Sequence, residues 1–263
     1  MRGRLLVVGL LALTAGCGGL GVSDGGANTP TLTPVPVPDT PEAESGVYPP
    51  GVDPGGTVDA DRLVDSHYEA LEGRSYTRYE RRVISVGHDR GVTVERFNAT
   101  TWVGDGVYRR DVRRVHRREG GAATESRTST LVVEDRRYTH WSVNDSVAVE
   151  RAESTRPPAT GLRELLAVNV TSVRLTGYGS EPFVRIGGHG SGAPGVPNDT
   201  TYRIDALVSS EGIVRQLTVT LGPEAVGSGY DMVYVLRYRG IDETTVPRPD
   251  WLEQRSASAA ETR

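Results

Sequence analysis

The pattern of apolar and polar residues changes along the chain, and each change predicts a different kind of segment. A short apolar run covers residues 5–13 and follows Arg2 and Arg4. Residues 18–56 are rich in glycine, threonine and proline and show no apolar period. Helical and then alternating patterns follow, which predict one folded domain. We therefore divide the chain into a signal peptide at 1–16, a disordered stalk beginning with Cys17 at 17–56, a single domain at 57–252 and a frayed tail at 253–263.

Two segments of the predicted domain have the pattern of amphipathic helices. Between Asp59 and Leu71, apolar residues recur at helical spacing, and Gly73 is a natural stop. The face so formed holds Leu63, Val64, His67, Tyr68 and Leu71. A second, shorter helix is predicted over Gly161–Val168, with Thr160 as its N-terminal cap.

The remaining periodic segments alternate with a period of two and are rich in valine, tyrosine, threonine and arginine, which predicts strands. The predicted strands are 75–86, 92–103, 106–116, 129–134, 137–143, 147–152, 173–178, 201–209, 212–221 and 230–239. Residues 187–199 are interpreted as a Gly/Pro-rich excursion. The predicted fold class is α+β: a long curled antiparallel sheet, or half-barrel, with the N-terminal helix and the short mid-chain helix packed in its concave side.

The apolar run ends in Thr14-Ala15-Gly16-Cys17, which resembles a lipobox. The run is too short to span a bilayer, because a spanning helix needs about 20 apolar residues. The resemblance implies cleavage after Gly16 and a diacylglycerol-type lipid on the Cys17 thiol, the membrane anchor of the mature protein. The alternative is an ordinary secretory signal. Cys17 is the single cysteine, which excludes an intramolecular disulfide and a multi-cysteine metal site.

Four of the five asparagines lie in Asn-x-Ser/Thr sequons. They are Asn98, Asn144, Asn169 and Asn198. This density predicts N-glycosylation, which requires a domain outside the cell. The predicted location is therefore the extracellular face of the cell membrane.

The formal net charge of −4 gives no nucleic-acid signature, and the histidines show no paired metal-ligand spacing. We therefore expect no nucleic-acid partner, no metal, no cofactor and no catalytic residue. Six arginines, at 109, 110, 113, 114, 117 and 118, crowd the predicted strand 106–116 and the two residues after it. They either hold a phosphate or an acidic polymer, or pair with acidic neighbours on a solvated strand.

A row of large side chains could line a ligand cavity. Tyr230, Met232, Tyr234 and Leu236 share one face of a predicted strand, and Tyr138 and Trp141 lie in another strand. These residues either contact a hydrophobic ligand such as a lipid chain or pack on the helices as core.

Three stretches resemble a group of haloarchaeal surface lipoproteins: the lipobox with its Thr/Pro stalk, His67-Tyr68-Glu69-Ala70-Leu71 running into Ser75-Tyr76-Thr77, and the ending Val246-Pro247-Arg248-Pro249-Asp250-Trp251. The order of elements also resembles the half-barrel of LolA- and LppX-type lipoprotein carriers. Architecture alone does not imply function.

These features give three hypotheses for a membrane-anchored extracellular lipoprotein. The first is a non-enzymatic protein whose curled sheet holds a lipid or another hydrophobic ligand. The second is an envelope structural or interaction module with a filled core. The third is a hydrolase, for which the sequence contains no motif.

Overall fold

The computed structural model describes residues 48–88, 91–167, 169–178, 181–191, 200–223 and 229–254. Cys17, Gly16, Asn198 and the predicted signal peptide lie outside the described residues, as does the stalk up to residue 47. Within the described part, no helix is long and apolar enough to cross a membrane.

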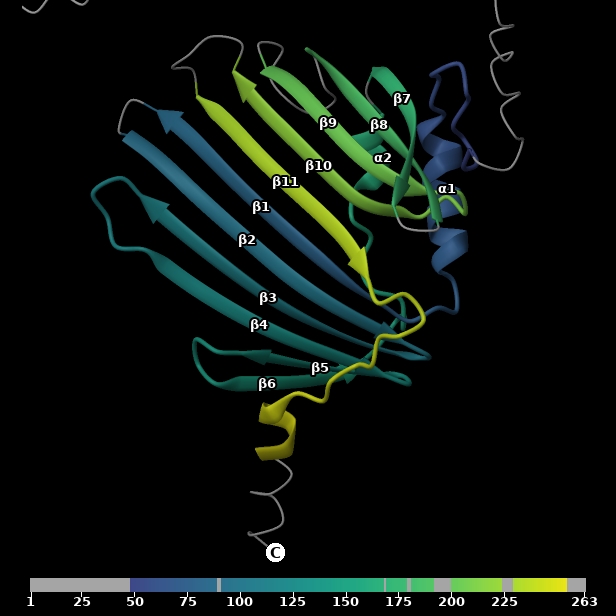
Figure 1. Ribbon diagram of the computed structural model, residues 1–263. Helices are drawn as coiled ribbons and strands as arrows, with labels where there is room; N and C mark the ends of the chain where they lie inside the picture. The colour runs from purple at the N-terminus through teal and green to yellow at the C-terminus, as the bar shows by residue number, and fades with distance from the viewer. Residues whose placement is uncertain are drawn as a thin grey trace, which may run out of the picture. The chain divides into compact units, whose positions relative to one another are not determined.

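Eleven strands form one antiparallel sheet, which is open and curled (Figure 1). The strands are β1 (Tyr76–His88), β2 (Gly91–Gly104), β3 (Val107–Arg118), β4 (Thr124–Val133), β5 (Arg136–Trp141), β6 (Ser146–Arg151), β7 (Val170–Tyr178), β8 (Glu181–Ser191), β9 (Thr200–Ser209), β10 (Val214–Pro223) and β11 (Tyr230–Arg239). This confirms the predicted long antiparallel sheet.

The sheet consists of two meanders joined side by side. Its strand order is β6-β5-β4-β3-β2-β1-β11-β10-β9-β8-β7, so the first and the last strand are neighbours in the middle. Thr77 pairs with Arg239 and Val86 with Tyr230 in this central ladder. The chain therefore passes from one edge, β6, to the opposite edge, β7, and its connection carries the second helix.

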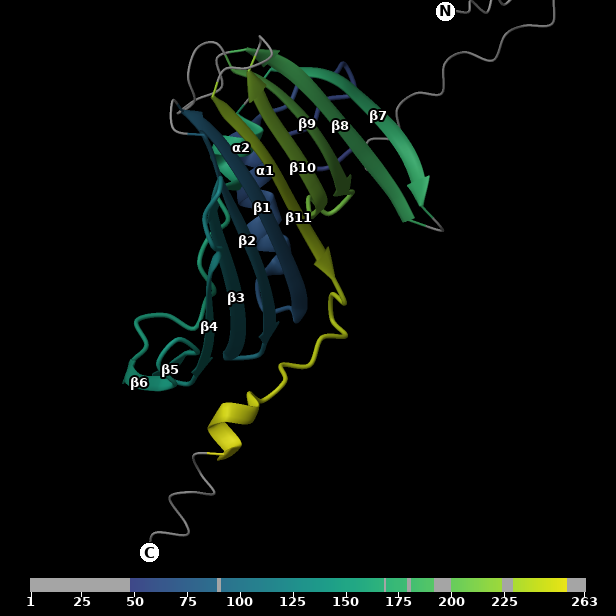
Figure 2. The same cartoon turned by 90° about the vertical axis from the view of Figure 1, so that its left-hand side faces the viewer.

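Two helices lie on the concave side of the sheet (Figure 2). Helix α1 covers Ala60–Leu71, and the Asp59 carboxylate caps it by accepting a hydrogen bond from the Arg62 backbone N–H at 3.1 Å. Helix α2 covers Leu162–Leu166. Its N-cap is Gly161 in the left-handed conformation, without a side-chain cap, so the prediction that Thr160 caps this helix was wrong.

The hydrophobic core lies between the helices and the concave face of the sheet. Leu63 and Val64 of α1 and Leu162 and Leu166 of α2 are at most 2% exposed. They join the inward-facing side chains of β8–β11 in one cluster, which includes Ile186, Ala206, Leu217 and Leu236. Burial of this apolar surface holds the helices on the sheet.

The strand β8 is the main difference from the predicted order of elements. Residues 187–191 belong to this strand instead of starting an excursion. Gly188 and Gly190 lie opposite Ile204 and Tyr202 of β9. A Cβ atom would come within 2.9 Å of the Ile204 Cγ1 at the first glycine and within 2.8 Å of the Tyr202 hydroxyl at the second. These glycines therefore make room for large neighbours within a ladder.

Both ends of the folded part differ from the predicted boundaries. Val52 is 7% exposed and bridges to Val58, so packing begins before residue 57. At the other end, residues 250–254 form a helical turn that includes part of the predicted tail. The segment before this turn reaches β3, where the Pro247 carbonyl accepts a hydrogen bond from Arg109 Nη1 at 3.4 Å.

Candidate functional site

A groove of about 500 Å³ lies over strands β2–β5. Its lining side chains are mainly those on the face turned away from α1 and α2, which we call the outer face. The lining residues are Asn98, Thr100, Asp111, Val112, Arg113, Arg127, Thr128, Ser129, His140 and Ser142. The volume falls within the range of small-molecule sites. Most of the lining residues are polar, but their carbon atoms form most of the surface that they expose to the groove.

The register of four strands brings these side chains together. Thr100 lies opposite Asp111, which lies opposite Ser129, which in turn lies opposite His140. Because residues opposite one another in adjacent strands share a face, they form a polar row across the sheet. The sequence contained these residues, but only the pairing of the strands places them next to one another.

Charges in the groove are paired within the protein. The Asp111 carboxylate accepts hydrogen bonds from Arg109 at 2.6 Å and from the Ser129 hydroxyl at 2.6 Å. Glu125 accepts from Arg113 at 2.7 Å and from Arg127 at 2.7 Å. These bonds, that of Arg113 first, lower the pKa of Glu125 to about 2. On this face, Arg109 and Arg113 therefore pair with acidic neighbours, one of the two alternatives for the arginine-rich strand.

The C-terminal segment flanks the groove at β5. The Trp251 ring stacks on His140 with centroids 5.4 Å apart, and His140 Nε2 lies 2.8 Å from the Asp145 carboxylate. Ser129 donates its hydroxyl to Asp111 and not to His140. In this arrangement the serine, histidine and aspartate do not form the relay in which a histidine activates a serine nucleophile.

The predicted ligand-lining row on β11 faces the concave side. Met232, Tyr234 and Leu236 are between 0% and 8% exposed and belong to the core cluster, and Tyr230 packs against it. The Tyr234 hydroxyl donates to the Thr160 carbonyl at 3.5 Å, next to α2. In this conformation the row contacts protein.

The structure does not bring the other two predicted ligand residues together with that row. Tyr138 lies opposite Leu131, on the outer face, whereas Trp141 lies opposite Thr128, on the concave face. The two residues are three positions apart in one strand, so their side chains point to opposite faces. Trp141 is 39% exposed near the sheet edge formed by β6.

A buried ionic cluster on the concave face was not predicted from the sequence. Glu80 Oε2 lies 3.2 Å from Arg78 Nη2 and 3.0 Å from Arg110 Nη2. The side chains of Arg78 and Glu80 are 2% and 6% exposed. Burial lowers the pKa of Arg110, which the charge of Glu80 partly offsets. The arginine-rich strand β3 thus directs Arg110 inward, while Arg109 remains on the outer face.

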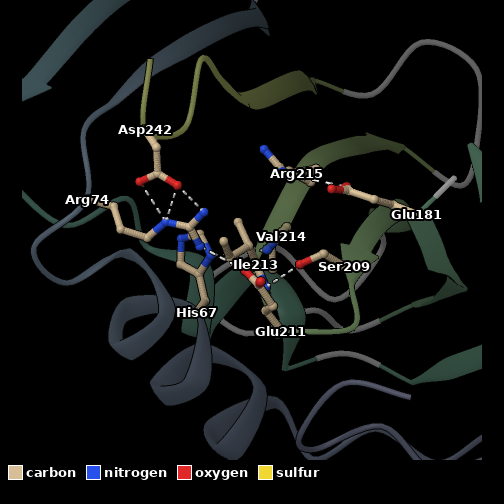
Figure 3. A network of polar contacts seen from close by, with 9 residues as sticks. All are labelled: His67, Arg74, Glu181, Ser209, Glu211, Ile213, Val214, Arg215 and Asp242. Carbon is tan, nitrogen blue, oxygen red and sulfur yellow. Dashed lines mark hydrogen bonds and ion pairs between the residues drawn. The ribbon is translucent and has the colours of Figure 1, made fainter. Parts of the chain in front are cut away.

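His67 joins α1 to the hairpin between β9 and β10 (Figure 3). Its Nδ1 accepts a hydrogen bond from the Val214 backbone N–H at 3.1 Å, and the residue is fully buried. Burial, and then the positive charge of Arg78, lower the pKa of His67 to about 3. Nearby, Arg74 pairs with Asp242 at 2.5 Å and with Glu211 at 2.8 Å. His67 is therefore a neutral docking residue at physiological pH.

Three of the four predicted glycosylation sites can be located. Asn98, Asn144 and Asn169 are exposed. Asn98 also lines the groove. In the described part of the chain, no group of three or more histidine, cysteine, aspartate or glutamate side chains is arranged to hold a metal ion.

Comparison with known proteins finds similarity among solved structures. No protein-family model matches the sequence, and no curated protein matches it. A DUF1329 family protein from Desulfovibrio piger is similar at 9% sequence identity and a TM-score of 0.24, over 73% of this chain and 93% of that chain. A TM-score this low establishes no common function. The resemblance to haloarchaeal lipoproteins stays a prediction.

Proposed function

We propose that this protein is a non-enzymatic binding module, held on the extracellular face of the cell membrane by a lipid on Cys17. Its core is filled, and its outer-face groove binds a neutral, hydroxyl-rich glycan of the cell envelope. The observation that carries this proposal is the groove over β2–β5, in which a mainly carbon surface is set with a few hydroxyl and amide groups and the charges are already paired.

The packing of the concave side supports a filled core. Helices α1 and α2 place fully buried leucines on the sheet, and the aromatic row of β11 contacts them or their neighbours. A binding surface is therefore better sought on the outer face. This favours the interaction module over a lipid carrier.

The chemistry of the groove supports a neutral polyhydroxylated ligand. Thr100 presents a hydroxyl group and Asn98 an amide. The Ser129 and Ser142 hydroxyls donate to Asp111 and to the Arg127 carbonyl, and their oxygens remain as acceptors. Hydroxyl and amide groups both donate and accept hydrogen bonds, as sugar hydroxyls do. Arg113 and Arg127 share one carboxylate, so a polyanion would have to compete with Glu125 for them.

The test measures binding of the purified full-length protein to envelope polysaccharide from its own host. Thr100→Val removes a groove hydroxyl at nearly constant volume. Loss of one such hydrogen bond costs about 1 kcal/mol, so we expect affinity to fall roughly fivefold. Thr220→Val is the matched control, because Thr220 is exposed on β10, away from the groove. Equal binding by both variants, or no binding by the wild type, would refute the glycan site.

Asn98 requires a parallel variant in this experiment. A glycan attached to Asn98 would enter the groove that the residue lines and compete with an external ligand. Asn98→Gln removes the attachment site and keeps an amide. We expect it to bind at least as tightly as the wild type when the protein is made in its host.

A hydrophobic ligand on the concave side is the second candidate. The observation in its favour is that α1 and α2 are joined by exposed ion pairs, from Arg163 to Asp61 and to Asp65, the latter at 2.7 Å. The two helices could therefore move away from the sheet together. Native mass spectrometry of the protein, gently extracted from host membranes, distinguishes the candidates: a co-purifying lipid supports carriage, and its absence supports the filled core.

A further inference from the structure

Four polar residues form a row across the middle of the concave face. Tyr238 of β11 lies opposite Arg78 of β1, which lies opposite Thr101 of β2, which lies opposite Arg110 of β3. Residues paired in this way have Cβ atoms about 5 Å apart on a common face. The row therefore places two guanidinium groups on either side of a threonine hydroxyl.

Three residues of the row are buried and the side chain of Arg110 is 16% exposed, yet several polar atoms of the row have no hydrogen-bond partner among the described residues. Arg78, Thr101 and Tyr238 are 1%, 0% and 4% exposed. Besides Arg78 Nη2, which is ion-paired with Glu80, the atoms are Arg78 Nε, Thr101 Oγ1, Arg110 Nη1 and Tyr238 Oη. The Tyr238 oxygen lies close enough to the Arg78 guanidinium to accept from it, so what lacks a partner at Tyr238 is the O–H donor. Buried donors without an acceptor are costly, and native proteins rarely leave several together. All four of these atoms can donate.

The charge of the row is also unbalanced. Glu80 is the carboxylate within ion-pair distance of both Arg78 and Arg110, which leaves one positive charge without a counter-ion among the described residues. The surrounding titratable groups supply no negative charge. Burial raises the pKa of Tyr234 and of Tyr238 and keeps both neutral, and His67 is neutral because its pKa is lowered. A buried excess charge requires a partner.

We propose that the row binds one small inorganic monoanion, such as chloride, between Arg78 and Arg110 and beside the Thr101 hydroxyl. The guanidinium N–H groups and the hydroxyls supply donors, and the anion balances the charge that Glu80 leaves. The burial of the row favours a small ion over a lipid headgroup, since a headgroup would have to bring its chain past the packed helices. The anion would lie over β1–β3 of the first meander, next to its junction with β11.

The proposal predicts that halide stabilises the folded protein, by an amount that grows with the logarithm of its concentration above Kd. Detergent-solubilised full-length protein is melted in sodium chloride, in sodium bromide and in sodium gluconate of equal ionic strength. We expect the melting midpoint to rise by on the order of 3–6 °C for each tenfold increase of halide above its Kd, and not with gluconate. The same midpoint in halide and gluconate would overturn the proposal.

Isosteric variants test whether the halide binds at this row. Thr101→Val and Tyr238→Phe each remove one hydroxyl of the row, and we expect the melting midpoint to begin to rise only at a several-fold higher halide concentration. Thr139→Val is the matched control, because Thr139 is a buried threonine of the same sheet outside the row. A wild-type halide response in the row variants would place the ion elsewhere and overturn the proposal.

Anomalous scattering from crystals grown in bromide locates the ion directly. A peak within hydrogen-bonding distance of Arg78 and Arg110 is the expected result, and density for water alone or for a lipid headgroup contradicts it. None of these measurements involves the outer-face groove. The failure of this proposal is therefore distinguishable from the failure of the glycan-binding function.

Discussion

At the scale of single residues, burial lowers the pKa of His67 more than the positive charge of Arg78 does. The imidazole is surrounded by core and held by the Val214 N–H, and the charge of Arg78 adds to the burial. The folded protein therefore disfavours the imidazolium, whereas an unfolded chain accepts a proton near pH 6.5. This difference makes a pH-dependent contribution to stability.

The first prediction concerns this pH dependence. Between about pH 6.5 and pH 3 the unfolded state binds a proton at His67 that the folded state excludes, so the free energy of unfolding falls as pH falls. The expected slope is up to about 1.4 kcal/mol per pH unit. His67→Asn keeps an acceptor for the Val214 N–H but does not titrate, and it should flatten the slope measured by denaturant unfolding. The exposed His116→Asn is the control and should retain the wild-type slope; equal slopes for all three proteins would contradict the assignment.

The second prediction concerns Glu80. Glu80→Gln leaves Arg78 and Arg110 buried without a counter-charge, which should lower the free energy of unfolding by about 3–5 kcal/mol. Glu95→Gln breaks the partly exposed pair with Arg82 and should cost about 0–1 kcal/mol. Urea denaturation measures both values. If Glu80→Gln changed the free energy of unfolding by less than about 1 kcal/mol, water or other groups would be balancing the charge of the two arginines.

Alternation along a strand shows which residues share a face, but it does not show which face is buried. Arg78, Glu80 and Arg82 alternate with Tyr79 and Arg81, and both sets contain charge. As the first strand of a meander, β1 would be an edge strand, where inward charges remain solvated. Its pairing with β11 makes it central. That pairing joins residues about 160 positions apart, beyond the reach of local pattern.

At the scale of elements, the β9–β10 hairpin receives the helix α1. Gly212 lies in its turn with φ of +92°, and its N–H donates to the Ser209 carbonyl at 2.9 Å. A Cβ at this glycine would lie 2.4 Å from the Ser66 Oγ of α1. The turn therefore needs glycine both for its backbone conformation and for the close approach of the helix.

The third prediction separates these two requirements. Gly212→Ala should lower the free energy of unfolding by about 2–4 kcal/mol, because strain and collision with α1 combine. Gly106→Ala is the matched control, since Gly106 has φ of +63° in the β2–β3 turn but faces open space. It should cost about 1 kcal/mol. Equal costs in thermal or chemical denaturation would show that α1 does not press on the hairpin.

The sequence predicted the helix α1 and ten of the eleven strands from their periodicity, and the structure confirms these elements with shifted ends. It missed β8 because glycines at 187, 188 and 190 are typical of loops. Their presence in a ladder depends on Tyr202 and Ile204 of the next strand, which fill the space above them. At this strand, packing against the neighbouring strand overrides the low strand propensity of glycine.

At the scale of the whole molecule, the two meanders serve different purposes. Strands β7–β11 carry most of the core beneath α1 and α2, while β2–β5 carry the groove on the outer face. The groove could not be predicted from the sequence, because its residues come from four strands with similar polar faces and the sequence pattern does not show how these strands pair. The anchor, by contrast, is a local motif around Cys17 and could be predicted without a fold.

The most direct measurement of the central claim, a binding module held outside the cell by its lipid, is fractionation of cells that produce Cys17→Ser beside the wild type and Ser23→Ala. The account predicts that the wild type and Ser23→Ala remain with the membrane, and that only the wild type and Ser23→Ala gain the mass of a lipid. Cys17→Ser should appear folded in the medium. A Cys17→Ser protein that stays membrane-bound would contradict the account.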